Sequence, residues 1–429
     1  MTTTSAPRED GAQTILVARQ PIFNRDREIW GYELLFCLPE TEEGDSVCLD
    51  DENMASRIIA DGLPTALIDL PPESQILLKC PPRFILDQSY LMFPENRCVI
   101  ALDCSELMDE HLFEACARLK DQGYSLAVND YRGEEAISAF AGIADYARID
   151  VGDIPAREVI RLRKSLRPFE CRSIAAGVTS WEVFEGVRSI GFTDFQGPFF
   201  SKPEIVPGRK IPAGMTARLE LMQEISRREC HIEELPRIIG HDPSLSYRLL
   251  KFINSAAFSL RSTVASIQQA VSLLGCSPLR RWAQVVLMAD MDESYKGAEL
   301  TFNALKRAKF IESLAAISPK FADRQESMFL LGMLSLMDAM LGIPMEQVLD
   351  GMPLDEEFRA ALCGDLHELR AWIDLVECVE VADWETARKY MKALGISPSQ
   401  AASKYMQANT WAREHCEGFQ RRGAAAAHG

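Results

Sequence analysis

The sequence has no long uninterrupted apolar run that would suit a membrane span. Its most apolar stretch, 328–345, contains Asp338 and is broken near its end by Pro344, whereas a spanning helix needs about 20 consecutive apolar residues. We therefore expect a buried helix here and no membrane insertion. Residues 1–13 also lack the apolar segment of a secretion signal, which favours a cytoplasmic protein.

Paired cysteines and an excess of positive charge are also missing. The 12 cysteines are scattered from Cys37 to Cys416 without a C-x-x-C pair, which argues against disulfide or zinc frameworks and suits a reducing compartment. The chain carries 63 acidic against 46 basic residues, a formal net charge of −17. This charge repels phosphate backbones, so we expect no nucleic-acid partner.

Apolar residues are abundant enough for two or three packed domains, at 47% of 429 residues. Short β-rich runs alternate with helical patterns over 14–200, and they predict a closed (β/α)8 barrel. The expected strands are 14–18, 28–36, 75–80, 98–103, 125–130, 146–150, 172–177 and 193–197. The first two are separated only by a turn, which would also suit an antiparallel pair.

A stretch rich in proline and glycine, 202–214, predicts a domain boundary. Beyond it, apolar residues recur at three- and four-residue steps and indicate a helical bundle to about residue 416. The predicted domains are therefore 14–203 and 215–416, an α/β barrel followed by an all-helical domain.

Four fragments of the first half resemble the EAL family, whose members hydrolyse cyclic di-GMP. They are ARQPIFNRDREIWGYELLF (18–36), SLAVNDY (125–131), ADYARIDVGDI (144–154) and FTDFQGPFFSKP (192–203). Residues 234–258 and 263–283 resemble the HDOD domain, a helical module related to HD hydrolases. The order matches that of EAL–HDOD bacterial signalling proteins. The resemblance implies a modified TIM barrel followed by a helical bundle.

The resemblance also identifies the positions that would hold a pair of metal ions. Glu33 in YELL matches the first metal-binding glutamate, but Cys37 replaces an arginine that contacts phosphate, and Lys79 replaces an asparagine. The glutamate expected on the next strand is missing. Ala101 or Leu102 aligns best there, with Asp103 one residue away.

Later positions are changed as well. The paired aspartates of the family become Asn129 and Asp130, and the lysine thought to assist the water becomes Arg148. Ala176 and Thr179 replace two glutamates, while Gln196 is retained. The predicted vestigial site comprises Glu33, Lys79, Asn129, Asp130, Arg148, Asp150 and Gln196.

This composition predicts an ion-pair cluster in place of a metal site. Hard divalent cations need several oxygen ligands, yet Glu33 and Asp130 are the clearly retained metal-site carboxylates. Lys79 and Arg148 would repel a cation. We expect no catalytic residues, no metal and no cofactor, and a salt bridge from Arg148 to Asp130, Glu33 or Asp150.

The helical half offers no better metal site. Its H-D pair, His241–Asp242, is followed by Pro243, so Asp242 is predicted to cap a helix. Met337 precedes Asp338 where an HD enzyme could carry a histidine. We expect no metal hydrolysis in this half.

Three functions follow from these observations. The first is a non-catalytic signalling adaptor that contacts other signalling proteins through the HDOD domain, with a homodimer as a candidate assembly. The second is a cyclic di-GMP phosphodiesterase that holds Mg²⁺ or Mn²⁺ through Glu33, Asp130 and Asp150. The third is a receptor that binds cyclic di-GMP without cleaving it, for which Lys79 and Arg148 could pair with phosphate.

Overall fold

The computed structural model describes most of the chain. The described ranges are 16–37, 70–103 without residue 72, 110–133, 138–202 without residue 153, 266–289, 295–350 and 354–426. Residues 105, 204, 239, 249, 250, 253, 264 and 352 are described singly. They form two compact units. The first lies within Met1–Gly197 and Asp374–Asn409, and the second within Pro198–Ile373 and Thr410–Gly429.

Eight strands of the first unit close into a barrel in sequence order. They are β1 Leu16–Asn24, β2 Ile29–Cys37, β3 Gln75–Lys79, β4 Cys98–Asp103, β5 Ser125–Asn129, β6 Tyr146–Asp150, β7 Arg172–Ala176 and β8 Asp194–Gln196. From β2 to β8 neighbouring strands are parallel, whereas β1 is antiparallel to both β2 and β8. The predicted barrel and its antiparallel first pair are therefore confirmed.

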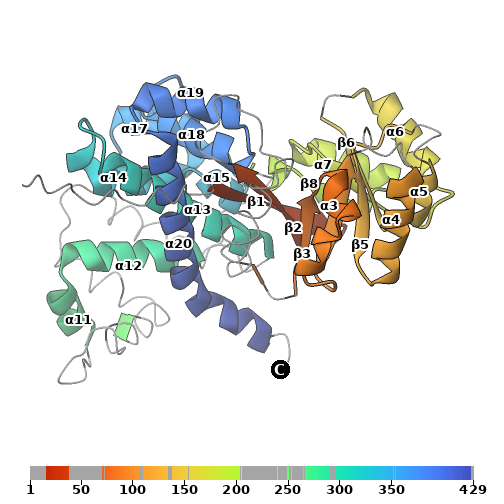
Figure 1. The fold of residues 1–429 in the computed structure, drawn as a ribbon. Coiled ribbons are helices and arrows are strands. Elements are labelled where there is room, and N and C mark those ends of the chain that lie inside the picture. The colour runs from red at the N-terminus through yellow and green to blue at the C-terminus, as the bar shows by residue number, and fades with distance from the viewer. Residues whose placement is uncertain are drawn as a thin grey trace, which may run out of the picture. The chain divides into compact units, whose positions relative to one another are not determined.

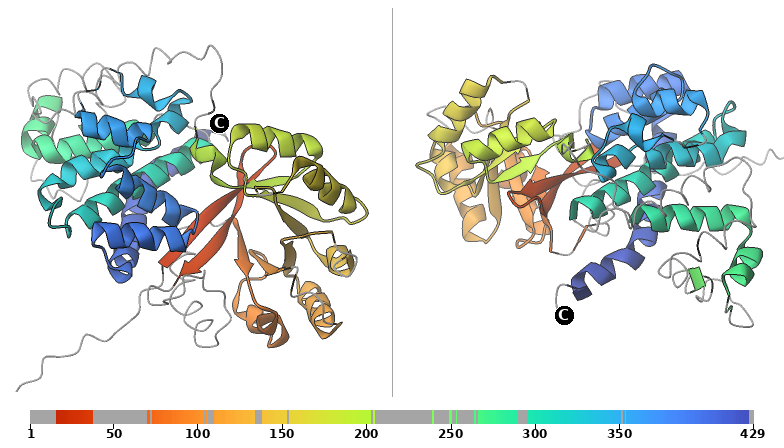
Figure 2. Two further views of the ribbon diagram at one scale, coloured as in Figure 1. Left: turned by 90° about the horizontal axis from the view of Figure 1, so that it is seen from above. Right: turned by 180° about the vertical axis from the view of Figure 1, so that it is seen from behind.

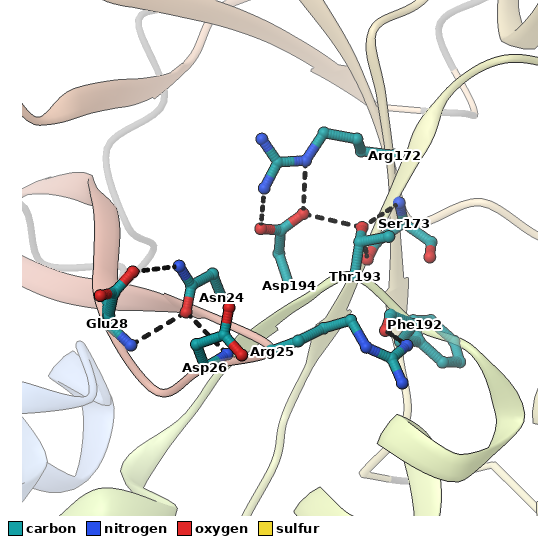
Figure 3. Close-up of polar contacts among 9 residues, drawn as sticks. All are labelled: Asn24, Arg25, Asp26, Glu28, Arg172, Ser173, Phe192, Thr193 and Asp194. Carbon is teal, nitrogen blue, oxygen red and sulfur yellow. Dashed lines mark hydrogen bonds and ion pairs between the residues drawn. The ribbon is translucent and has the colours of Figure 1, made fainter.

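The first strand runs six residues beyond its predicted end at residue 18, through Pro21 to Asn24. At Pro21 it is paired with β2 but not yet with β8, whose pairing begins at Ile22. At Pro21, the edge of β1 that faces β8 is therefore unpaired, which is where a strand tolerates the missing N–H of proline. The turn after β1 is held by the Asn24 side chain, whose Oδ1 accepts from the backbone N–H of Asp26 and of Glu28, both at 2.9 Å (Figure 3).

Helices flank the strands of the barrel (Figure 1). They are α3 Pro82–Leu86, α4 Glu110–Asp121, α5 Ser138–Ile143, α6 Ala156–Ser165 and α7 Trp181–Ile190, with a 3-10 turn, η2, at Ser89–Met92. Two further views show the same arrangement (Figure 2). Helix α7 begins at a Ser180 side chain that accepts from the Val183 N–H and ends at left-handed Gly191, a usual pair of helix caps.

Seven apolar side chains from six of the eight strands form a core cluster in the barrel. They are Ile22, Leu77, Val99, Ala101, Ala127, Tyr146 and Ile174. Each is buried, with at most 9% of its surface exposed. Because side chains alternate between the two faces of a strand, residues two positions along from this core share its face.

The second half of the chain is helical, as predicted. After η5 Pro198–Ser201 its described elements are α11 Ile267–Leu274, α12 Cys276–Ala289, α13 Tyr295–Ala315, η7 Ala322–Arg324, α14 Gln325–Leu334, α15 Met337–Leu341, α16 Met345–Val348, α17 Glu356–Cys363, α18 Arg370–Glu380, α19 Trp384–Leu394 and α20 Pro398–Ala426. The predicted domain boundary at 202–214 falls mostly outside the described residues, so both domain limits stay predictions.

The apolar stretch 328–345 forms two short buried helices and not one span. Residues 328–334 of α14 are all buried, and α15 follows after a break and ends at left-handed Gly342. No helix within the described ranges is both long enough and apolar enough to cross a bilayer.

Candidate functional site

Four of the seven predicted site residues, Lys79, Asn129, Asp150 and Gln196, end a strand at one mouth of the barrel. The last residues of β3 to β8 are Lys79, Asp103, Asn129, Asp150, Ala176 and Gln196. Because these strands are parallel, their last residues lie at the same end of the barrel, where TIM barrels carry their chemistry. Several of them stand two positions beyond a core residue, as Lys79 does after Leu77 and Asn129 after Ala127, so their side chains share the inner face.

Glu33 lies in the middle of β2 and is 3% exposed. Its Oε2 accepts from Gln196 Nε2 at 2.5 Å and from Arg148 Nη2 at 3.3 Å. Gln196 Oε1 in turn accepts from Arg148 Nε at 3.1 Å. The three side chains form a closed triangle that neutralises the carboxylate, and the predicted salt bridge of Arg148 is confirmed with Glu33 as its partner.

Lys79 pairs with Asp103, whose carboxylate lies 2.6 Å from the ammonium. The two side chains are 38% and 26% exposed. The sequence places Asp103 one residue from the best match to the expected glutamate, and Asp103 shares the inner face with Ala101, two residues earlier. Strand alternation is the signal that could have identified it.

Asp130 does not join this cluster, contrary to the expected grouping with Lys79 and Arg148. Its backbone is left-handed at φ 51°, and its exposed carboxylate pairs with Arg132 at 2.7 Å. The strand ends at Asn129, so Asp130 is no longer bound by the alternation of β5.

Two other predicted residues have local surroundings of their own. Asp150 Oδ1 accepts from the backbone N–H of Gly152 at 2.9 Å, so it closes its own loop. Asn129 is 2% exposed, and within the described part of the chain its Oδ1 has no hydrogen-bond partner. A buried acceptor without a donor costs about 1–3 kcal/mol.

The described residues of the mouth offer few free oxygen ligands for a pair of divalent metal ions. Such a pair needs several free carboxylate or carbonyl oxygens, yet Glu33 is engaged by Gln196 and Arg148, and Asp103 by Lys79. Over the ranges that the structure describes, no three His, Cys, Asp or Glu side chains converge as metal ligands would. Paired in this way, the side chains that the structure describes at the mouth do not fit two metal ions.

The opposite end of the barrel carries another ion pair, between Arg172 and Asp194, which the sequence analysis missed. Asp194 is fully buried and accepts from Arg172 Nε at 3.0 Å, from Arg172 Nη2, and from Thr193 Oγ1 at 2.8 Å (Figure 3). Arg172 also lies over the rings of Trp30 and Tyr146. Burial raises the pKa of Asp194, although Arg172 acts in the opposite direction. Residues at this end of a TIM barrel usually serve stability.

The histidines of the helical half that the structure describes are not placed as metal ligands. His367 Nδ1 accepts from the Leu369 N–H at 3.2 Å. His415 stacks on Trp411 with ring centroids 4.0 Å apart, and its Nδ1 lies 2.7 Å from the Trp411 carbonyl oxygen. The predicted cap at Asp242 and its neighbour His241 lie outside the described residues.

Comparisons with known proteins extend over nearly the whole chain. The HDOD domain family matches residues 211–340. A Vibrio cholerae protein, cyclic di-GMP phosphodiesterase CdgJ, is 30% identical over 411 residues, which cover 95% of this chain and 94% of that protein. YuxH of Bacillus subtilis, an uncharacterised protein, is 28% identical over 408 residues, which cover 92% of this chain and 98% of that protein.

Solved structures of EAL domain proteins are also similar to this chain. An EAL domain protein of Listeria monocytogenes is 17% identical and covers 44% of this chain and 87% of its own, with a TM-score of 0.36. The YkuI protein of Bacillus subtilis, solved with cyclic di-GMP and calcium, is 17% identical and covers 61% and 71%, with a TM-score of 0.38. On the near full-length match to the Vibrio protein and the HDOD match, this chain belongs to the EAL–HDOD family of two-domain signalling proteins.

Proposed function

We propose that the protein acts in cyclic di-GMP signalling as a non-catalytic adaptor, with an inert EAL-like barrel and an HDOD domain that contacts other signalling proteins. The observation that carries the proposal is the bond from Arg148 to Glu33 at 3.3 Å. It occupies the carboxylate that an active site would give to a metal ion.

The positive charge of Arg148 opposes the binding of a metal ion to Glu33 in place of Arg148. Arginine stays protonated in proteins, so it can neither withdraw its charge nor relay a proton well. Two like unit charges about 4 Å apart near a protein surface repel by about 4 kcal/mol, and a divalent ion at Glu33 would meet repulsion of this kind. Lys79 adds a second positive charge beside Asp103.

A phosphodiesterase is the second candidate function. It is favoured by the name of the Vibrio relative, which is 30% identical along nearly all of this chain. Hydrolysis would require Glu33 to leave Arg148 and Gln196, and further oxygens would have to come from residues such as Asp103, Asn129 and Asp150. A receptor that binds without cleavage is supported by the two cations, Lys79 and Arg148.

Hydrolysis and binding assays on the full-length protein separate these candidates. We expect no linear dinucleotide to form from cyclic di-GMP with Mg²⁺ or with Mn²⁺. Metal-dependent turnover that is lost in Glu33→Ala would establish the phosphodiesterase. Calorimetric titration that detects tight binding without turnover would favour the receptor.

The adaptor role should also be tested on the full chain. Deleting everything after residue 214 would remove Asp374–Asn409, which belongs to the same compact unit as the barrel. Loss of a partner after that deletion would therefore not assign the contact to the HDOD domain. Substitution of an exposed apolar residue such as Leu273, which is 56% exposed on α11, gives a cleaner test.

A further inference from the structure

Gln20 connects the polar cluster of the barrel mouth to a distant segment of the same compact unit. It lies on β1 opposite Glu33, and its Oε1 accepts from Gln196 Nε2 at 3.0 Å. Its Nε2 donates to the backbone carbonyl oxygen of Glu380 at 3.3 Å. Glu380 is the last residue of α18, where carbonyl groups lack partners within the helix. The Gln20 side chain therefore caps α18.

The charge of Glu33 fixes the direction of these hydrogen bonds. A carboxylate can only accept, whereas an amide donates through nitrogen and accepts through oxygen. Gln196 must therefore turn its NH₂ group to Glu33, and its Oε1 then faces Arg148. Its second N–H bonds to Gln20 Oε1, which leaves Gln20 Nε2 to donate to Glu380.

The series of hydrogen bonds that starts at Glu33 ends at a tight turn between α18 and α19. Ala382 has a left-handed backbone at φ 59°, which is uncommon for a residue with a side chain. Asp383 caps α19 by accepting from the Thr386 N–H at 3.1 Å. Three backbone hydrogen bonds, from Val381 to Glu377, from Ala382 to Val379 and from Asp383 to Cys378, hold the turn from within. Gln20 adds a bond from the barrel.

We propose that Gln196 and Gln20 form an amide relay that couples the Glu33–Arg148 ion pair to the turn between α18 and α19. A ligand or substitution that changes the charge or pairing of Glu33 frees Gln196 to rotate. The bond from Gln20 to Glu380 then weakens, and the turn opens more often. This goes beyond the proposed function, because it gives the barrel mouth a route to a segment more than 300 residues away in sequence.

Amide hydrogen exchange of the full-length protein tests the relay. In Gln20→Leu, we expect peptides spanning residues 378–386 to exchange about three- to tenfold faster, the effect of one lost hydrogen bond on local opening. Gln75→Leu is the matched control. The Gln75 side chain also donates from a barrel strand to a backbone carbonyl oxygen, that of Asn96, at 3.3 Å, and its loss should leave these peptides unchanged.

Glu33→Leu distinguishes a relay from a purely local effect of Gln20 on the end of α18. Glu33 does not bond to the turn itself, because Gln196 and Gln20 lie between them. We expect Glu33→Leu to speed exchange of the same peptides, while peptides of β4 report whether the barrel stays folded. If Glu33→Leu does not fold, Glu33→Gln removes the acceptor-only group with little change of shape and should give a smaller increase. Unchanged exchange in Gln20→Leu overturns the proposal. The proposal is also overturned if Gln20→Leu speeds exchange of these peptides while substitution of Glu33 does not. It is overturned as well if Gln75→Leu speeds their exchange as much as Gln20→Leu does.

Discussion

The ammonium of Lys79 lies 2.6 Å from the carboxylate of Asp103, across the ends of the neighbouring strands β3 and β4. A side-chain cation thus stands beside a carboxylate at the mouth of the barrel. The pair is partly exposed, so its effect on stability is modest. Its effect on cation binding should be larger.

Replacing Lys79 should make the mouth more attractive to a cation. In Lys79→Asn the positive charge disappears and Asp103 becomes available, so we expect Mn²⁺ to bind about tenfold more tightly than in the original protein. Electron paramagnetic resonance titration of free Mn²⁺ measures the change. Lys389→Asn, which breaks an exposed pair with Glu385 on α19, should leave the affinity unaltered. Equal effects of both substitutions would contradict a site at Asp103.

Removing Arg148 should destabilise the fold, because Glu33 is buried and would lose its counter-charge. We expect Arg148→Met to lower the free energy of unfolding by about 3–5 kcal/mol, as breaking a buried ion pair does. Urea denaturation gives the value. The double variant Glu33→Gln, Arg148→Met removes both charges and should recover part of the loss. A double variant that is no more stable than Arg148→Met would show that the charge is not the cause.

Gly177, just after β7, should not accept a side chain. Its φ is +70°, and an added Cβ would lie 2.5 Å from Asp150 Oδ1. We expect Gly177→Ala to destabilise the protein by at least about 1 kcal/mol through backbone strain and this clash. Gly186→Ala is the control, since Gly186 lies within α7 with nothing within 4 Å of an added Cβ. That substitution should stabilise by about 0.5–1 kcal/mol. Thermal unfolding of the two variants gives opposite shifts if the reasoning holds.

His415 should make the protein less stable in mild acid. Burial lowers the pKa of His415, and the positive charges of Lys309 and Arg281 act in the same direction, against Glu414 and the Trp411 carbonyl. A histidine with a lowered pKa stabilises the fold above its usual pKa of about 6.5, and this contribution is lost as the pH falls toward the folded-state value. The slope can reach about 1.4 kcal/mol per pH unit.

Denaturation between pH 7.5 and pH 5 on the His415→Gln variant checks this dependence. We expect a shallower loss of stability below about pH 6.5 than in the original protein. His367→Gln, at an exposed position, is the control and should keep the original slope. Identical slopes in all three proteins would show that His415 does not determine the acid sensitivity.

The sequence by itself determined the strands of the barrel and the residues that stand at its expected metal-ligand positions. Apolar runs such as CVIALD and SLAVN are buried on both faces of a parallel sheet, so β4 and β5 were predicted within one residue of their ends. Lys79, Arg148 and Ala176 can be read directly from the sequence. They led to the prediction of an ion pair for Arg148, which the structure confirms with Glu33 as the partner.

Only the tertiary structure decided which charges meet. Partner choice depends on strand register, on alternation of side chains and on backbone conformation after the last paired residue, all of which are fixed when the barrel closes. These factors pair Lys79 with Asp103 and turn Asp130 outward to Arg132. The folded structure also brings Gln20 next to Glu380, 360 residues away in sequence. No local feature of the sequence indicates that two positions so far apart will be neighbours.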